Sequence, residues 1–124
     1  MRSTQQHRIQ IDFVERDVPK LMPPDTVLCL FRIVQEGLRN VSKHSRASRV
    51  EVRLEADSKA ISLRLSDNGV GFELSQGLAS IGIGIRSMKE RTWMLGGRFE
   101  VVSQPMQGTQ INVFIPLNSA RNAM

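Results

Sequence analysis

The order of the hydrophobic periods constrains the fold of this chain more than any other feature of its sequence. Apolar and polar residues alternate in five short runs, which is the pattern of half-buried strands. The five runs cover residues 8–14, 50–54, 61–65, 98–103 and 109–117. Helical signals occupy two stretches, 25–45 and 84–95. Because strands and helices do not alternate one for one, the pattern predicts an α+β sandwich, a two-layer fold with helices covering one face of a mixed, mostly antiparallel sheet.

Short links between the runs predict which strands are neighbours. A polar turn at residues 57–59 joins the second run to the third, and the link between the last two runs contains Pro105 and Gly108. Strands joined by so short a link are normally antiparallel neighbours. With 124 residues and no internal repeat, the chain is predicted to form a single domain, residues 1–124, whose core spans residues 8–117.

Each predicted helix has its own boundary signals. Asp25 is the expected N-cap of the first helix, and apolar residues spaced three and four apart predict its buried stripe. That stripe consists of Val27, Phe31, Val34, Leu38 and Val41. Residues 67–83 are rich in Gly and Ser and lack a convincing period, so the second helix is expected to begin near Gly84 and to end before Gly96-Gly97.

Cysteine use and hydropathy bear on the location of the protein. The single cysteine, Cys29, cannot form a disulfide within the chain, which indicates a reducing compartment. No apolar run approaches the roughly 20 residues of a membrane helix, and residues 1–10 lack the apolar core of a signal peptide. These features predict a cytoplasmic domain that makes no membrane contact itself. They leave room for membrane anchoring of a longer parent protein.

The excess of basic over acidic residues suggests a polyanionic partner, but the scattered positions of the basic residues argue against one. Seventeen Lys and Arg against twelve Asp and Glu give a net charge of +5. The basic residues are scattered, apart from a loose group between Arg39 and Arg53, and Tyr is absent from the few aromatic residues that could stack on bases. We therefore predict no nucleic-acid binding. The alternative is a basic nucleic-acid binder in which the motifs described next are only turns.

A polar stripe on the first predicted helix has an unusual member. Glu36, Asn40, Lys43 and His44 recur at the spacing of one helical face. Every amphipathic helix has a polar face, so the stripe alone is weak evidence, but Asn is a poor helix former for a mid-helix position. Its neutral amide oxygen suits Mg²⁺, which uses few protein ligands at nucleotide sites. Glu36, one turn away, is placed to accept a proton or to hold a water molecule.

The segment Asp67-Asn68-Gly69 follows the third alternating run. Asn-Gly after such a run is a strong hairpin signal, yet no partner strand follows at once, which favours a functional loop. An Asp at the end of a strand can accept a hydrogen bond from an amino group, and Gly69 and Gly71 let a flat ring approach the backbone. These are the requirements of adenine recognition.

Two glycines precede the second predicted helix. Free N–H groups at Gly82 and Gly84, together with the helix dipole, predict an anion site, whereas the simpler alternative is a Gly-rich connector. The segment matches neither a P-loop nor a Rossmann turn. Thr109, at the entry to the last run, is either a support for Asp67 or part of a tight turn. Met88 lies one turn after the glycines, where filling a gap in the core is the simpler role.

Together and in this order, the motifs resemble the catalytic ATP-binding domain of two-component sensor histidine kinases, within the GHKL ATPase superfamily that includes gyrase-type topoisomerases. The matching segments are 32–44 (the N box), 67–72 (the first glycine box) and 82–91 (the second glycine box). Lys43-His44 and the Met-Lys-Glu-Arg ending of the last box are most similar to the branch that signals to response regulators with helix-turn-helix output domains. The resemblance implies the Bergerat α/β sandwich and a kinase that uses ATP and Mg²⁺.

The resemblance also implies a role for each motif residue. On the phosphate side, Asn40 would ligate Mg²⁺ and Glu36 would be the base or the water-positioning group, with Lys43 and His44 near the phosphates. The remaining implied contacts are Asp67 to the adenine amino group, Gly69 and Gly71 around the purine, Gly82 and Gly84 at the lid over the phosphates, and Thr109 in support of Asp67. Met88 is a further candidate for contact with the nucleotide.

One departure from the family pattern decides the expected mechanism. Such kinases carry a phosphoacceptor His on a preceding dimerisation helix, and neither His7 nor His44 has that setting. The chain is therefore expected to be a monomeric catalytic domain that does not autophosphorylate in cis. It would transfer the γ-phosphoryl group of ATP to a helical dimerisation domain outside this chain and so signal to a response regulator. The alternatives are a serine kinase of the anti-sigma-factor type and a non-catalytic nucleotide-sensing module.

Overall fold

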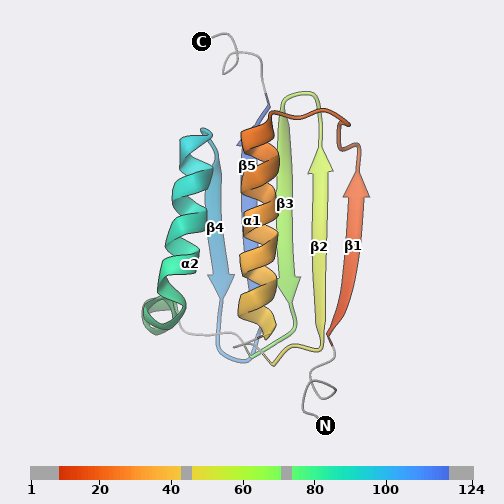
Figure 1. Cartoon of the computed structure of the whole chain (residues 1–124). Helices are drawn as coiled ribbons and strands as arrows, with labels where there is room; N and C mark the ends of the chain where they lie inside the picture. The colour runs from red at the N-terminus through yellow and green to blue at the C-terminus, as the bar shows by residue number, and fades with distance from the viewer. Residues whose placement is uncertain (1–8, 43–45, 71–73, 118–124) are drawn as a thin grey trace.

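The structure, a computed structural model, describes residues 9–42, 46–70 and 74–117, and within 74–83 it describes the backbone alone. In chain order its elements are β1 (Gln10–Arg16), α1 (Pro24–Asn40), β2 (Arg49–Ala56), β3 (Ala60–Asp67), α2 (Leu74–Met94), β4 (Arg98–Ser103) and β5 (Thr109–Pro116). The strands form a five-stranded sheet in the order β1-β2-β3-β5-β4, and both helices lie on the same face of it (Figure 1). The predicted two-layer α+β architecture is confirmed.

The strand pairings follow the links in the sequence. β1 is parallel to β2, while the pairs β2·β3, β3·β5 and β4·β5 are antiparallel. At the turn between β2 and β3, the Asp57 carboxylate accepts the N–H groups of Lys59 and Ala60 at 2.7 and 2.9 Å. In the β3·β5 pair, Asp67 stands opposite Thr109. The antiparallel neighbours expected from the two short links are therefore confirmed.

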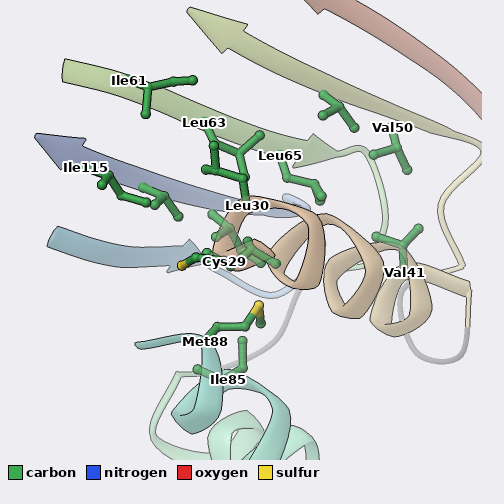
Figure 2. Close-up of a cluster of buried hydrophobic side chains, with 14 of the residues drawn as sticks. Cys29, Leu30, Val41, Val50, Ile61, Leu63, Leu65, Ile85, Met88 and Ile115 are labelled. Atoms are coloured by element: carbon green, nitrogen blue, oxygen red, sulfur yellow. The ribbon is translucent and has the colours of Figure 1, made fainter. Parts of the chain in front are cut away.

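The hydrophobic core lies between the sheet and the two helices. Alternate residues of the inner strands point toward the helices, and apolar side chains of α1 and α2 pack against them in a single cluster (Figure 2). The most deeply buried members are Ile33, Val50, Val52, Ile61, Leu65, Met88 and Ile115. Complete burial of one such side chain is worth about 1.5–3 kcal/mol, so this layer fixes the ends of the strands and helices relative to one another. Neither described helix is long and apolar enough to cross a membrane.

Helix α1 begins one residue earlier than its predicted cap. Its N-cap is Pro23, Pro24 occupies the first turn, and Asp25 lies inside that turn. The prediction that Asp25 is the N-cap is therefore wrong. The ring of a proline fixes φ near the helical value and removes an N–H that would have no partner in the first turn, so the proline pair starts the helix without a capping side chain.

The buried face of α1 also differs from the predicted stripe. Val27 and Phe31 are 46% and 58% exposed, and Val34 and Leu38 are only half-buried. The face that packs on the sheet lies roughly a quarter of a turn away around the helix. It consists of Thr26, Cys29, Leu30, Ile33, Gly37 and Val41. Thr26 and Gly37 carry small side chains that allow close approach, and a count of large apolar residues does not select them.

Helix α2 begins at Leu74, ten residues before the predicted start at Gly84. The expectation that residues 67–83 lack helix is wrong for residues 74–83, so that Gly82 and Gly84 lie inside the helix rather than at its first turn. The overlooked signal is the spacing of Leu74, Leu78, Ile81 and Ile85, which follows one helical face across the intervening glycines and serines. The predicted end is confirmed, since Gly96 has a φ of 76° and the N–H groups of Gly96 and Gly97 bond back to Trp93 and Thr92.

Candidate functional site

The segments that carry the motifs meet at one end of the sheet. The last turns of α1, the end of β3, the start of α2 and the link between β4 and β5 all lie at the lower end in Figure 1. The turn between β2 and β3 lies at the opposite end. The topology thus brings together three motifs that are separated by about thirty and fifteen residues in the sequence.

Asp67 is the best-defined polar group at this end. It is the last residue of β3, it is 9% exposed, and its Oδ1 accepts the Gly69 N–H at 2.7 Å. Burial raises the pKa of this carboxyl, and the backbone N–H groups of Gly69 and Thr109 offset part of that rise. A carboxylate offers about four lone-pair sites. Two N–H donors therefore leave acceptor capacity for a ligand.

The link between β4 and β5 closes directly on Asp67. Gly108 has a φ of 80°, and a β-carbon built on it would overlap the main-chain carbonyl oxygen of Asp67. The hydroxyl of the next residue, Thr109, lies 2.8 Å from the Ser103 hydroxyl. Thr109 therefore supports Asp67 through its main chain, while its side chain ties β5 to β4.

Asn68 holds the loop after β3 against the segment before β2. Its Oδ1 accepts the backbone N–H groups of Ser48 and Arg49, both at 3.0 Å, and its Nδ2 donates to the Ser48 hydroxyl at 3.0 Å. Farther along the loop, the Met106 N–H donates to the Val70 carbonyl. The role of Asn68 was not predicted. The Asn-Gly pair carried a signal for local turn formation but none for a contact twenty residues away.

Glu36 and Gly37 lie where α1 contacts α2 and β3. A β-carbon built on Gly84 of α2 would overlap the Glu36 carboxylate, whose Cδ lies 2.8 Å from that position. A β-carbon on Gly37 would lie 2.8 Å from Cδ1 of Leu65 on β3. The absence of side chains at these two glycines therefore lets the half-buried Glu36 sit between α1 and α2, at the end of the sheet that carries Asp67.

Asn40, at the end of α1, has an incomplete hydrogen-bond set. Its residue is half-buried, and its Nδ2 is buried with no hydrogen-bond partner in the described structure. The amide nitrogen and oxygen exchange places by rotation about the last side-chain bond, so this position can present either a donor or a hard oxygen ligand. An unpaired buried amide is costly and indicates that a further group completes the set.

The other predicted site residues are only partly described. Lys43, His44 and Gly71 lie outside the described residues. Gly82 lies within α2. Met88 is buried in the core, where its carbonyl oxygen accepts a hydrogen bond from the Thr92 hydroxyl at 2.8 Å, so contact with a ligand stays a prediction for this residue.

Comparison with protein families identifies the class of protein. The family described as histidine kinase-, DNA gyrase B- and HSP90-like ATPase matches residues 26–119. This match covers α1 from its third residue, all of α2 and the whole of β2–β5, with the Asp67 end of the sheet inside it. The chain therefore belongs to this ATPase family, as the three motifs predicted.

Curated relatives point to one branch of the family. Sensor histidine kinase LiaS of Bacillus subtilis is 49% identical over 88 residues, which cover 71% of this chain and 24% of the relative. The histidine-protein kinase/phosphatase DegS of Brevibacillus brevis is 34% identical over 111 residues, covering 90% and 28%. Sensor protein VraS of Staphylococcus aureus is 40% identical over 89 residues, covering 72% and 25%. The chain thus spans about a quarter of the length of these relatives.

Solved structures agree with this assignment. The histidine kinase domain of the blue-light-activated histidine kinase of Erythrobacter litoralis EL346 superimposes with a TM-score of 0.75 at 26% identity, covering 92% of this chain and 54% of that one. The histidine kinase AdeS of Acinetobacter baumannii gives a TM-score of 0.74 at 16% identity, covering 92% and 57%. The second likeness shows a shared fold. The chain has the architecture of histidine kinase ATPase domains.

Proposed function

We propose that this chain binds Mg-ATP at the Asp67 end of the sheet and delivers the γ-phosphoryl group to a histidine on a helical dimerisation domain outside the chain. The observation that carries the proposal is the buried Asp67 carboxylate, which two backbone N–H groups orient and which keeps acceptor capacity. The amino group of adenine is a donor that fits this acceptor, whereas guanine carries a carbonyl oxygen at the same ring position. Preference for ATP over GTP follows.

The phosphate end of the nucleotide would lie near the last turns of α1. Asn40 supports this placement because its buried Nδ2 has no hydrogen-bond partner among the described residues. If the amide nitrogen and oxygen exchange places, this position presents an oxygen that is a suitable ligand for Mg²⁺. The ion, when bound, would neutralise phosphate charge. Glu36, which lies between the two helices, would hold a water molecule or accept a proton, and Lys43 and His44 would lie close to the phosphates. Catalysis in such a site consists mostly of positioning and charge neutralisation.

The purine pocket and the lid complete the proposed site. Gly69 and Gly71 would let the ring approach the backbone beside Asp67, and Thr109 would keep that carboxylate in place through its main chain. Gly82 and Gly84, inside α2, would border the phosphates together with Met88. The glycines would permit close backbone approach in the first half of α2.

Phosphotransfer is tested with the acceptor supplied in trans. The chain is mixed with the helical dimerisation domain of a full-length relative, Mg²⁺ and γ-labelled ATP, and the label on the helical domain is followed. We expect acid-labile, base-stable phosphate on that domain and none on this chain alone. A label on a serine of an anti-sigma-factor antagonist would favour the serine-kinase alternative. Tight nucleotide binding without any transfer would favour the sensing module.

A further inference from the structure

The outer edge of β4 is flanked by a hollow on each face of the sheet. On the helix side, a hollow of about 450 Å³ lies between α2 and β4, with walls that include Ile85, Trp93, Phe99 and Val101. On the opposite face, a hollow of about 860 Å³ extends over the outward-pointing side chains of β2–β5. Trp93 and Phe99 line both. The two hollows therefore meet at this edge.

The edge itself is open. β4 pairs with β5 on one side, and no strand in the described part of the chain pairs with its other side. An edge strand presents N–H and C=O groups that can bind a further strand. Because successive side chains of a strand point to opposite faces, an added strand would place its residues alternately in the two hollows. The geometry of this edge thus suits an extended polypeptide better than a compact ligand.

The helix-side hollow combines an apolar floor with a positive rim. Trp93 is 58% exposed, and the Lys89 ammonium group lies 4.8 Å from the centre of its ring. Arg86 and Lys89 are both exposed at the rim, against a single anion, Glu90. The rim therefore carries one net positive charge, which favours an anionic occupant.

We propose that the outer edge of β4 binds an extended, acidic segment of another polypeptide as an added strand. An apolar side chain of that segment fills the hollow beside Trp93, and a carboxylate two residues along, on the same face of the added strand, pairs with Arg86 and Lys89. A second copy of this chain is a poorer occupant, because β4 reads Arg-Phe-Glu-Val-Val-Ser and has no net negative charge to offer the rim. The binding edge shares none of the nucleotide contacts proposed above.

Trp93 is the single tryptophan of the chain, so its fluorescence reports on this hollow directly. The probes are two seven-residue peptides that carry valine and a charged residue on the same face of the strand. The glutamate peptide is Val-Thr-Glu-Thr-Val-Thr-Glu, and the lysine peptide has lysine in place of each glutamate. We expect the glutamate peptide to shift the Trp93 emission saturably and to protect amides of residues 98–103 from hydrogen exchange. The lysine peptide should bind at least about tenfold more weakly.

The matched variant reverses the charge of the rim. In the double variant Arg86→Glu, Lys89→Glu, the preference should change over to the lysine peptide, and because both side chains are exposed, an unchanged urea unfolding curve serves as the check on folding. Three results would overturn the proposal. They are no change in emission or exchange at millimolar glutamate peptide, equal affinity for the two peptides, and protection of residues 98–103 that depends only on the concentration of the chain itself.

Discussion

Gly108 packs so closely against the main-chain carbonyl of Asp67 that the β-carbon of any other residue would overlap the carbonyl oxygen. Gly108 also has a φ of 80°, a left-handed conformation that side chains disfavour. The link between β4 and β5 and the proposed adenine contact are therefore a single structural unit. A change in this link should therefore move the Asp67 carboxylate, because Thr109, the residue after Gly108, bonds to it through its backbone N–H.

The first prediction concerns the two glycines with positive φ. Gly108→Ala should lower the free energy of unfolding by about 1–2 kcal/mol for the left-handed conformation and by about 1–3 kcal/mol more for the overlap with Asp67. Gly96→Ala is the matched control, since Gly96 has a φ of 76° but its nearest contact, Cγ of Pro116, lies 3.7 Å away. Urea unfolding measures both. Equal losses in the two variants would show that the overlap contributes nothing.

The second prediction separates stability from activity at Gly84. Alanine is a better helix former than glycine by about 1 kcal/mol, so Gly84→Ala should leave the free energy of unfolding unchanged or raise it. The added β-carbon would displace the Glu36 carboxylate, a flexible group that can move aside. We therefore expect phosphotransfer to the helical domain in trans to fall about tenfold or more while the protein stays folded. Full activity in Gly84→Ala would argue that the position of Glu36 does not matter.

The third prediction is a pH dependence at Asp67. Burial raises the pKa of this carboxyl, so the folded protein binds a proton here more tightly than the unfolded chain does. The stability linked to this group is complete below the ordinary carboxyl pKa of about 4 and is lost as the pH rises through the raised pKa. Asp67→Asn removes the ionisation. We expect this variant to be more stable than the wild type at pH 7, with a difference that shrinks toward pH 3.5 in urea unfolding.

An Asp67→Asn variant that is less stable than the wild type at pH 7 would contradict this account, as would a stability difference that does not change with pH. Asp57 supplies the opposite case for comparison. The N–H groups of Lys59 and Ala60 lower the pKa of its carboxyl, so its contribution is present above the ordinary carboxyl pKa and is lost as the pH falls through the lowered value.

The fourth prediction concerns the Asn68 side chain. Asn68→Ala removes two acceptor bonds from the backbone and one donor bond to Ser48, which should cost about 1–2 kcal/mol because the hydrogen-bonding groups left behind are exposed to water. Asn68→Asp keeps the acceptor oxygen and should recover most of that loss. Urea unfolding again provides the measurement. If Asn68→Asp is as unstable as Asn68→Ala, the two backbone bonds are not the source of the stability.

The sequence predicted the strands better than the helices, for physical reasons. An alternation of period two leaves one choice of buried face, and β4 runs over Arg98–Ser103 as predicted. On α1, two overlapping stripes share the helical period, and contacts with the sheet select the one that contains Thr26 and Gly37. Those contacts involve residues distant in sequence, which a local pattern does not report.

The sequence predicts the motif residues of the candidate site but not the contacts that hold them in place. Asp67 lies where a buried acceptor is needed, at the end of a strand and beside Gly69. The hydrogen bond from the Ser48 N–H to Asn68 and the contact between Glu36 and Gly84 join segments that are distant in sequence and meet only in the fold. The start of α2 is hard to predict from the sequence, because glycines and serines interrupt a helical spacing of leucine and isoleucine.

The most direct test of the central claim is calorimetric binding of ATP to this chain in the presence of Mg²⁺, repeated with Asp67→Asn and with Asp57→Asn as the matched control at the far end of the sheet. We expect measurable affinity for ATP in the wild type and in Asp57→Asn, and a loss of about 10- to 100-fold in Asp67→Asn with the fold intact. Equal affinity of Asp67→Asn and the wild type for ATP would contradict the claim that this end of the sheet recognises adenine.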